Sequence, residues 1–217
     1  MGYGKNAQVD TSTLTLQVQA EHVAQFIEVE GIGAVHLIGH SVGGAVAALV
    51  ADGWPELVQS YTSVEGNFTL RDAFWSAEIS KKPLAEVEAI VDGYRADPDA
   101  WMAGAVPVAT ELSARLAREM LAAQPASTIQ AEARAVVEAT GMPEYLEMIR
   151  RLFASELPCF LIAGERSVDG WDAPDWAIEM CSNQVVMSGL GHMMMVEAPD
   201  QFADTILGCL EMIGDGK

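Results

Sequence analysis

A serine between two glycines is the strongest chemical signal in the chain. Ser41 lies in Gly39-His40-Ser41-Val42-Gly43, directly after the apolar run Val35–Ile38 and before the helix-forming segment Ala45–Val50. This motif also occurs by chance in glycine-rich loops, but a buried strand, a sharp turn and a helix form the context that exposes a serine nucleophile. Side chains at both glycines would crowd that turn. The pattern predicts a nucleophile at Ser41, with the Val42 N–H at the helix start facing a developing oxyanion.

A serine nucleophile needs a base, and the chain has four histidines. His192 follows a Gly-Leu-Gly segment just after the last expected strand, at the carboxyl edge where sites gather in parallel sheets. His36 lies within the apolar strand and His22 within a helix, so both are expected to be structural. His40 is too close to Ser41 in the chain to turn back on it, and we expect it in or around the pocket. The order serine, acid, histidine favours His192 as the general base.

Three carboxylates could orient that imidazole. Glu65 directly follows the apolar Val64, which ends the strand expected at Val58–Val64. Glu165 and Asp169 follow the strand expected to end at Ala163. All three are expected at the same edge of the sheet as Ser41. A carboxylate at the end of a strand is more often a solvated cap than a catalyst, so position alone leaves the choice open.

The elements that must position these residues alternate along the chain. The chain has 217 residues, half of them hydrophobic and a fifth charged, which is typical of one soluble domain with a substantial core. Strands are expected at 35–38, 58–64, 158–164 and 184–188, and helices at 14–30, 45–50, 174–180 and 199–213. This alternation predicts an α/β fold with a mostly parallel sheet of about four strands.

The middle of the chain has a different character. Residues 68–156 contain no β-rich run, and prolines separate segments rich in Ala, Leu, Glu and Arg, as they do between helices. This segment could be a long crossover, but its size favours an all-helical cap inserted over the sheet. We therefore expect a core formed by residues 1–67 and 157–217, and a cap formed by residues 68–156.

Charge and cysteine content exclude several classes of protein. The formal charge of −19 disfavours nucleic acid and anionic membranes as partners. The three cysteines, Cys159, Cys181 and Cys209, lie far apart, and each is expected to be a small buried hydrophobic residue. We expect no metal and no cofactor. The chain begins without a basic and apolar leader and has no membrane-spanning run, so a cytoplasmic location is expected.

Two motifs together resemble the α/β-hydrolase superfamily. One is Gly39-His40-Ser41-Val42-Gly43-Gly44, and the other is Gly191-His192-Met193-Met194-Met195-Val196-Glu197-Ala198-Pro199-Asp200-Gln201-Phe202. Members commonly end in a Gly-His-x-x-x-x-Glu-x-Pro-x-x-Phe segment. The resemblance covers essentially the whole chain. It implies that Ser41 is the nucleophile, that His192 is the general base and that residues 68–156 form the helical cap.

The acid departs from the usual pattern of that superfamily. Its common acid follows the penultimate strand in a Gly-x-x-Asp pattern, and Ser167 occupies that position here. Some capped members, including certain haloalkane dehalogenases, instead carry a Glu after the strand that follows the elbow helix. Glu65 matches that placement, so we expect Glu65 as the acid, with Asp169 second and Glu165 third. Dehalogenase activity is disfavoured because that chemistry resembles an Asp nucleophile, whereas this elbow carries Ser41.

The beginning of the chain departs further. Met1-Gly2-Tyr3-Gly4-Lys5 resembles the loop that follows the fourth strand in the superfamily, and the strands, the helix and the His-Gly oxyanion loop before it have no counterpart here. The elbow strand is therefore expected at an uncovered sheet edge, with a homo-oligomer or a missing N-terminal segment to cover it. Losing one oxyanion donor typically costs about 10²–10³-fold in turnover.

The resemblance implies a serine hydrolase, similar to a carboxylic ester hydrolase, that cleaves an ester or related acyl bond through Ser41, His192 and Glu65. Carbon–carbon bond or thioester hydrolysis fits the same residues. A cap with several aromatic residues, among them Phe74 and Trp75, would enclose a small or medium apolar substrate. The alternative is a non-catalytic or truncated α/β-hydrolase remnant that acts as a binding or interaction domain.

Overall fold

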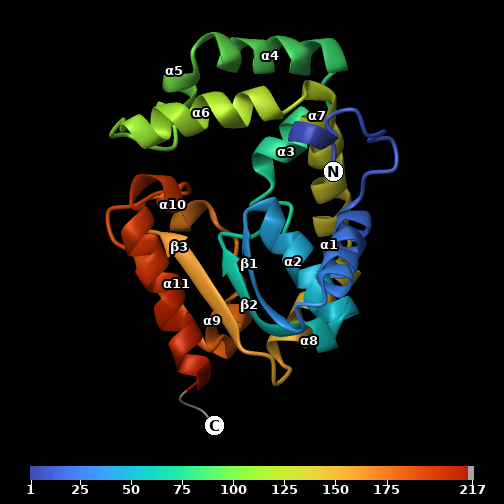
Figure 1. Cartoon of the computed structure of the whole chain (residues 1–217), viewed down its shortest axis with the longest axis vertical. Helices are drawn as coiled ribbons and strands as arrows, with labels where there is room; N and C mark the ends of the chain where they lie inside the picture. The colour runs from blue at the N-terminus through green and yellow to red at the C-terminus, as the bar shows by residue number, and fades with distance from the viewer. Residues whose placement is uncertain (215–217) are drawn as a thin grey trace.

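A four-stranded sheet forms the centre of the computed structural model, which describes residues 1–214 (Figure 1). Its strands are β1 (Val35–His40), β2 (Val58–Val64), β3 (Cys159–Gly164) and β4 (Asn183–Met187), and they lie side by side in chain order. All three neighbouring pairs are parallel. The predicted α/β fold with a parallel sheet of about four strands is confirmed.

Helices cover both faces of this sheet, as Figure 1 shows for α11 on one side and for α1, α2 and α8 on the other. The helices that pack on the sheet or beside it are α1 (Leu16–Glu30), α2 (Val42–Gly53), α8 (Pro143–Phe153), α9 (Asp175–Met180), α10 (Met194–Glu197) and α11 (Pro199–Gly214). Short 3₁₀ turns lie at Gly4–Asn6, Pro55–Leu57 and Val168–Gly170. Within residues 1–214 no helix is both long and apolar enough to cross a membrane.

The central strand β3 shows why the sheet needs helices on both sides. Leu161 and Ala163 are fully buried in the cluster formed with α1, α2, α8 and α9, whereas Phe160 and Ile162 are fully buried in the cluster formed with α11. Successive side chains of a strand point to opposite faces. A strand that is apolar at every position therefore requires two covered faces, as parallel sheets provide.

The remaining helices form a second layer beyond one end of the sheet. They are α3 (Phe74–Ile79), α4 (Leu84–Ala96), α5 (Pro98–Ala103), α6 (Glu111–Ala123) and α7 (Ala126–Thr140). In Figure 1, α4, α5 and α6 lie apart from the sheet, and α7 runs back toward α1. A small apolar cluster of its own, which includes Ile79, Val87 and Ile129, holds α3, α4 and α7 together.

One helix of the segment expected to form the cap packs with the sheet instead. In α8, Ile149, Leu152 and Phe153 are buried in the main core cluster with Tyr61 of β2. The ring centroids of Tyr61 and Phe153 lie 6.2 Å apart in an edge-to-face arrangement. The boundaries drawn from the sequence stay a prediction, and we propose that the cap ends before α8.

The strand that leads to Ser41 lies at an edge of the sheet. Within residues 1–214, β1 pairs with β2 and with no other strand. Ile38 of this strand is 45% exposed, and Phe26 and Val29 of the neighbouring helix α1 are also exposed. An open edge with apolar side chains is a template for further pairing. The expectation that a homo-oligomer or a missing N-terminal segment covers this edge stays a prediction.

The turns that follow β1 and β2 approach each other through glycine backbone. A Cβ atom added at Gly44 would lie 2.6 Å from the Gly66 Cα, and one added at Gly39 would lie 2.3 Å from the Gly43 carbonyl oxygen. The expectation that a side chain at Gly43 would crowd the turn is wrong, because a Cβ there meets nothing within 4 Å. The glycine that permits the close approach is Gly44, because it faces the neighbouring turn.

This contact makes a matched pair of substitutions informative. Gly44→Ala should lower the free energy of unfolding by about 1–3 kcal/mol, since the new methyl group meets backbone that cannot move aside cheaply. Gly43→Ala, one residue earlier in the same helix, should leave it unchanged or raise it by up to about 1 kcal/mol, because alanine favours the helix. Urea unfolding followed by circular dichroism measures both. Equal effects of the two substitutions would contradict the close approach.

Candidate active site

Ser41 occupies a strained position at the end of β1. Its backbone has φ 52° and ψ −126°, a left-handed conformation that a residue with a side chain seldom adopts. It caps the start of α2, and the first N–H groups of a helix have no acceptor within that helix. The Val42 N–H is the first of these groups, so it is available to a negatively charged oxygen beside Ser41.

Glu65 follows β2 in a second left-handed turn, with φ 42°. One oxygen of its carboxylate, Oε2, lies 2.5 Å from Nδ1 of His192. The other oxygen, Oε1, accepts hydrogen bonds from the Gly164 N–H at 2.8 Å and from the Ser167 hydroxyl at 2.5 Å. The side chain of Glu65 is only 4% exposed, so protein groups rather than water solvate this carboxylate.

These contacts determine the protonation of the pair. Burial raises the pKa of the Glu65 carboxyl, but hydrogen bonds from His192, Ser167 and Gly164 outweigh burial, and the pKa is lowered from its usual value. Glu65 is therefore ionised at neutral pH and accepts the Nδ1 proton of His192. With Nδ1 protonated, the lone pair of a neutral imidazole is on Nε2, where a serine hydroxyl can donate to it.

His40 connects the Ser41 turn to His192. Its Nε2 lies 2.9 Å from the backbone oxygen of His192, and the two imidazole rings are tilted with centroids 4.4 Å apart. Within residues 1–214 no hydrogen bond joins the Ser41 hydroxyl to His192. The structure thus brings Glu65 and His192 into direct contact, and His40, the residue before Ser41, contacts His192.

Burial gives His40 an unusual protonation behaviour. Burial, together with the nearby His192, lowers the pKa of His40 to about 4, although its hydrogen bond to the His192 backbone and the charge of Glu65 act in the opposite direction. His40 is therefore neutral at pH 7, and its Nε2–H donates to the His192 carbonyl. The sequence places His40 in or around the pocket, and the structure shows that it touches His192.

The other two carboxylates considered as the acid lie elsewhere. Glu165 is exposed, and its Oε2 accepts from the Gly189 N–H at 2.6 Å and from the Ser188 hydroxyl at 3.1 Å. Asp169 is exposed in a 3₁₀ turn. Ser167 occupies the position of the superfamily's usual acid and donates to Glu65 instead. The contact between Ser167 and Glu65 needs two different strand ends to meet, which no local pattern reveals.

The remaining histidines and cysteines have structural surroundings. His36 bonds through Nδ1 to the Ser60 hydroxyl at 2.8 Å, and Nδ1 of His22 lies 2.6 Å from the Val18 carbonyl oxygen. Cys159 and Cys209 are buried free thiols, and Cys181 is a half-buried one. In the part of the chain that the structure describes, no group of three or more His, Cys, Asp or Glu side chains could hold a metal ion.

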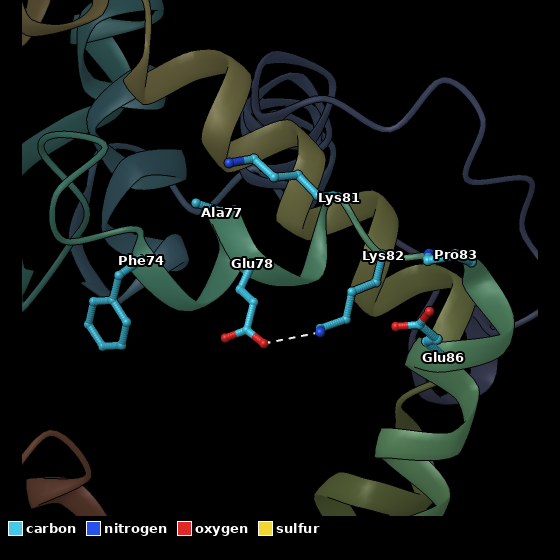
Figure 2. A pocket seen from close by; sticks show the side chains of 7 residues that line it. All are labelled: Phe74, Ala77, Glu78, Lys81, Lys82, Pro83 and Glu86. Carbon is cyan, nitrogen blue, oxygen red and sulfur yellow. Dashed lines mark ion pairs between the residues drawn. The ribbon is translucent and has the colours of Figure 1, made fainter.

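Apolar side chains border the site on the cap side. Met193 and Met195, which flank the first residue of α10, pack against a cluster formed by α5 and α6 that includes Met102 and Val106. A separate open depression of about 660 Å³ lies along α3, between the exposed ring of Phe74 and Glu86, and Figure 2 shows the seven side chains that line it. None of Ser41, Glu65 and His192 lines this depression, so it is distinct from the candidate site.

A parallel sheet with helices on both faces and a serine at a strained strand-to-helix turn is the architecture of the α/β-hydrolase class. The family model described as "Alpha/beta hydrolase family" matches residues 1–205, so this chain belongs to the α/β hydrolase family. The resemblance drawn from the sequence is confirmed. Membership brings the fold and a hydrolase ancestry, and it leaves the substrate open.

Solved structures are similar in fold. A carboxylesterase of the ammonia-oxidizing thaumarchaeon Nitrososphaera gargenis has a TM-score of 0.75 at 19% identity, and the match covers 100% of this chain and 79% of that chain. A thermophilic esterase has a TM-score of 0.67 at 18% identity, with 93% and 75% covered. Both similarities concern the fold alone.

One curated relative has a closer local match. The dihydrolipoyllysine-residue acetyltransferase component of the acetoin cleaving system of Cupriavidus necator is 41% identical over 95 residues, which are 40% of this chain and 25% of that protein. The matched part of this chain therefore spans about a quarter of the relative's length.

The partly buried, neutral state of His40 predicts a pH-dependent loss of stability. The unfolded chain binds a proton at His40 below about pH 6.5, whereas the folded state resists protonation until about pH 4, so this contribution is lost as the pH falls through that window. Between pH 7 and pH 5, the free energy of unfolding should fall by about 2 kcal/mol more for the wild type than for His40→Gln. Urea titrations at both pH values measure the difference. Equal losses in the two proteins would contradict a His40 that stays neutral in the folded state.

Proposed function

We propose that the chain is a serine hydrolase that cleaves an ester or a related acyl bond. The observation that carries this proposal is the contact between the buried Glu65 carboxylate and Nδ1 of His192, next to a serine on a strained turn. Membership of the α/β hydrolase family supports it, as do similarities in fold to esterases. In this proposal Ser41 is the nucleophile, His192 the general base and Glu65 the acid that orients it.

The proposed reaction proceeds through an acyl-enzyme. The Ser41 hydroxyl attacks the substrate carbonyl, and its proton passes to Nε2 of His192. Glu65 stabilises the resulting imidazolium, and the Val42 N–H donates to the oxyanion. When the tetrahedral intermediate collapses, the leaving alcohol takes the proton from His192. A water molecule then attacks the acyl group and gives a proton to His192. As the bond between the acyl carbon and the Ser41 oxygen breaks, His192 returns that proton to Ser41 and the acid product leaves.

The surroundings of the site favour an apolar substrate of small to medium size. Met193 follows His192 directly, and Met195 lies two residues further on. Both pack against the apolar cluster of α5 and α6, and Met195 also packs against the core cluster formed with α11. Apolar surroundings bind the acyl or alcohol portion of an ester without competing for the polar atoms that react.

A second candidate is a non-catalytic member that acts as a binding domain. The open edge of β1 and the absence of a Ser41–His192 hydrogen bond within residues 1–214 favour it. Both candidates use the same fold, and they differ in whether Ser41 is chemically activated.

Labelling with a fluorophosphonate separates the two candidates. This probe reacts with an activated serine hydroxyl, so the purified protein should gain a single adduct by intact mass, and Ser41→Ala should gain none. Circular dichroism establishes that both proteins are folded. A folded wild type that gains no adduct would favour the non-catalytic domain. An adduct that persists in Ser41→Ala would show that another residue reacts.

The identity of the acid predicts a contrast between two isosteric substitutions. Glu65→Gln removes the charge that orients His192 and should lower kcat on p-nitrophenyl esters on the order of 10³–10⁴-fold. Asp169→Asn, an equivalent change on an exposed turn, should leave kcat within about twofold of wild type. Retained turnover in Glu65→Gln together with loss in Asp169→Asn would reverse the assignment.

A further inference from the structure

The loop that carries His192 is rich in glycine. Backbone hydrogen bonds fix it at Leu190, whose N–H donates to the Met187 carbonyl oxygen at 3.3 Å and whose carbonyl oxygen accepts from the Arg166 N–H at 2.9 Å. Gly189-Leu190-Gly191 precedes the histidine, and Gly189 has φ 72°. Glycine has little conformational preference, so the two glycines around this leucine leave the backbone free to move on either side of it. The 2.5 Å contact between His192 and Glu65 nevertheless requires a fixed position. Groups outside the loop must supply it.

Charged side chains bind the backbone of this loop at three points. Glu165 accepts a hydrogen bond from the Gly189 N–H at 2.6 Å, and Nη1 of Arg166 donates to the Gly189 carbonyl oxygen. On the other side of the loop, Oε1 of Glu197 accepts from the Gly191 N–H at 2.8 Å. Hydrogen bonds with an ionised partner are about twice as strong as neutral ones. The loop is thus held from the end of β3 and from α10.

Arg166 and Glu197 also bind each other. Nη2 of Arg166 lies 2.9 Å from Oε1 and 2.8 Å from Oε2 of Glu197. The side chain of Glu197 is 10% exposed and that of Arg166 is 39% exposed, so the pair is partly shielded from water. A Cβ added at Gly191 would lie 2.9 Å from Nη2 of Arg166. The ion pair therefore packs directly against the backbone one residue before His192.

The same short turn holds the acid. Gly164 and Ser167, which flank Glu165 and Arg166, both donate to Oε1 of Glu65. The last residue of β3 and the three residues after it, 164–167, thus bind the carboxylate through the two outer residues and the histidine loop through the two inner ones. Displacement of the inner contacts would move His192 relative to an acid that stays in place.

We propose that Arg166, through its ion pair with Glu197, is a positioning residue that sets His192 against Glu65. This inference rests on the proposed serine hydrolase function. Without the guanidinium, the Gly189 carbonyl oxygen loses its donor, and Glu197 loses the partner that aims its oxygen at the Gly191 N–H. A displacement of about 1 Å in such a site can cost on the order of 10²-fold in rate.

The test compares Arg166→Ala with variants that separate charge from shape. Arg166→Lys keeps the charge without the two-pronged donor. Glu197→Gln keeps a side-chain oxygen for the Gly191 N–H but removes the ion pair. Arg151→Ala is the matched control. Arg151, on α8, forms a more exposed ion pair with Asp52, in which its Nη2 lies 3.8 Å from Oδ1. Each protein is assayed for its fluorophosphonate labelling rate and its melting temperature, and by NMR for the far-downfield proton of the His192–Glu65 hydrogen bond.

The expected result is a labelling rate about 10–100-fold lower in Arg166→Ala, an intermediate rate in Arg166→Lys and the wild-type rate in Arg151→Ala. The NMR signal of the far-downfield proton should decrease in the same order, from Arg151→Ala through Arg166→Lys to Arg166→Ala. If Arg166→Ala fails to fold, Glu197→Gln carries the test, with a lower rate and a weaker proton expected. Wild-type labelling and an undiminished proton in the folded Arg166 and Glu197 variants would overturn the proposal.

A wild-type protein that does not label would refute the proposed function and leave this inference to the NMR signal. A proton that is present in the wild type and lost in Arg166→Ala would support the positioning role. A proton that persists in Arg166→Ala, or that is absent from the wild type, would overturn it.

Discussion

The site depends on a close approach between two backbone turns. The Ser41 N–H donates to the Val64 carbonyl oxygen at 3.0 Å, and the Asn67 N–H donates to the Ser41 carbonyl oxygen at 3.3 Å. Gly44 and Gly66 meet where any side chain would separate the turns. Ser41 lies in one of these turns and Glu65 in the other, and both have a positive φ, 52° and 42°. Such angles cost free energy, and they persist only where the surrounding structure enforces them. Here the neighbouring turn enforces them, so the candidate nucleophile and the candidate acid hold each other in place.

Large buried aromatic side chains donate hydrogen bonds to the backbone of the Glu65 turn. The Trp171 indole N–H donates to the Gly66 carbonyl oxygen at 2.7 Å, and the Tyr145 hydroxyl donates to the Asn67 carbonyl oxygen at 2.7 Å. The Tyr61 hydroxyl donates to the Gly44 carbonyl oxygen at 3.0 Å on the elbow side. A buried backbone oxygen left without a partner costs free energy, so these three aromatic donors stabilise the observed conformation of the two turns. The helix α8 supplies one of these donors, which links the far end of the helical segment to the site.

The Glu65 carboxylate is the point at which separate parts of the chain meet. Its donors come from β3, from the turn after β3 and from the loop after β4. In a parallel sheet the carboxyl ends of the strands gather at one edge, so residues far apart in sequence share a small space. Because the carboxylate is shielded from water, each of these donors matters more than it would on the surface. The hydrogen bonds keep Glu65 ionised despite its burial, and this charge keeps His192 oriented.

Local patterns in the sequence determined the fold class, the strands and three residues proposed for the site, namely Ser41, Val42 and His192. Mostly apolar segments that alternate with helical ones predicted buried parallel strands, and a serine between glycines predicted the turn at Ser41. Both features depend on neighbours in the chain. The sequence alone left Glu65, Asp169 and Glu165 as alternatives, and only a resemblance to a family favoured Glu65. Tertiary structure placed Glu65 beside His192, set His40 against the His192 backbone and joined Arg166 to Glu197. It also gave Gly44 the role expected of Gly43 and placed α8 on the sheet. These features arise where strand ends meet across the sheet, and no spacing along the chain encodes such distances.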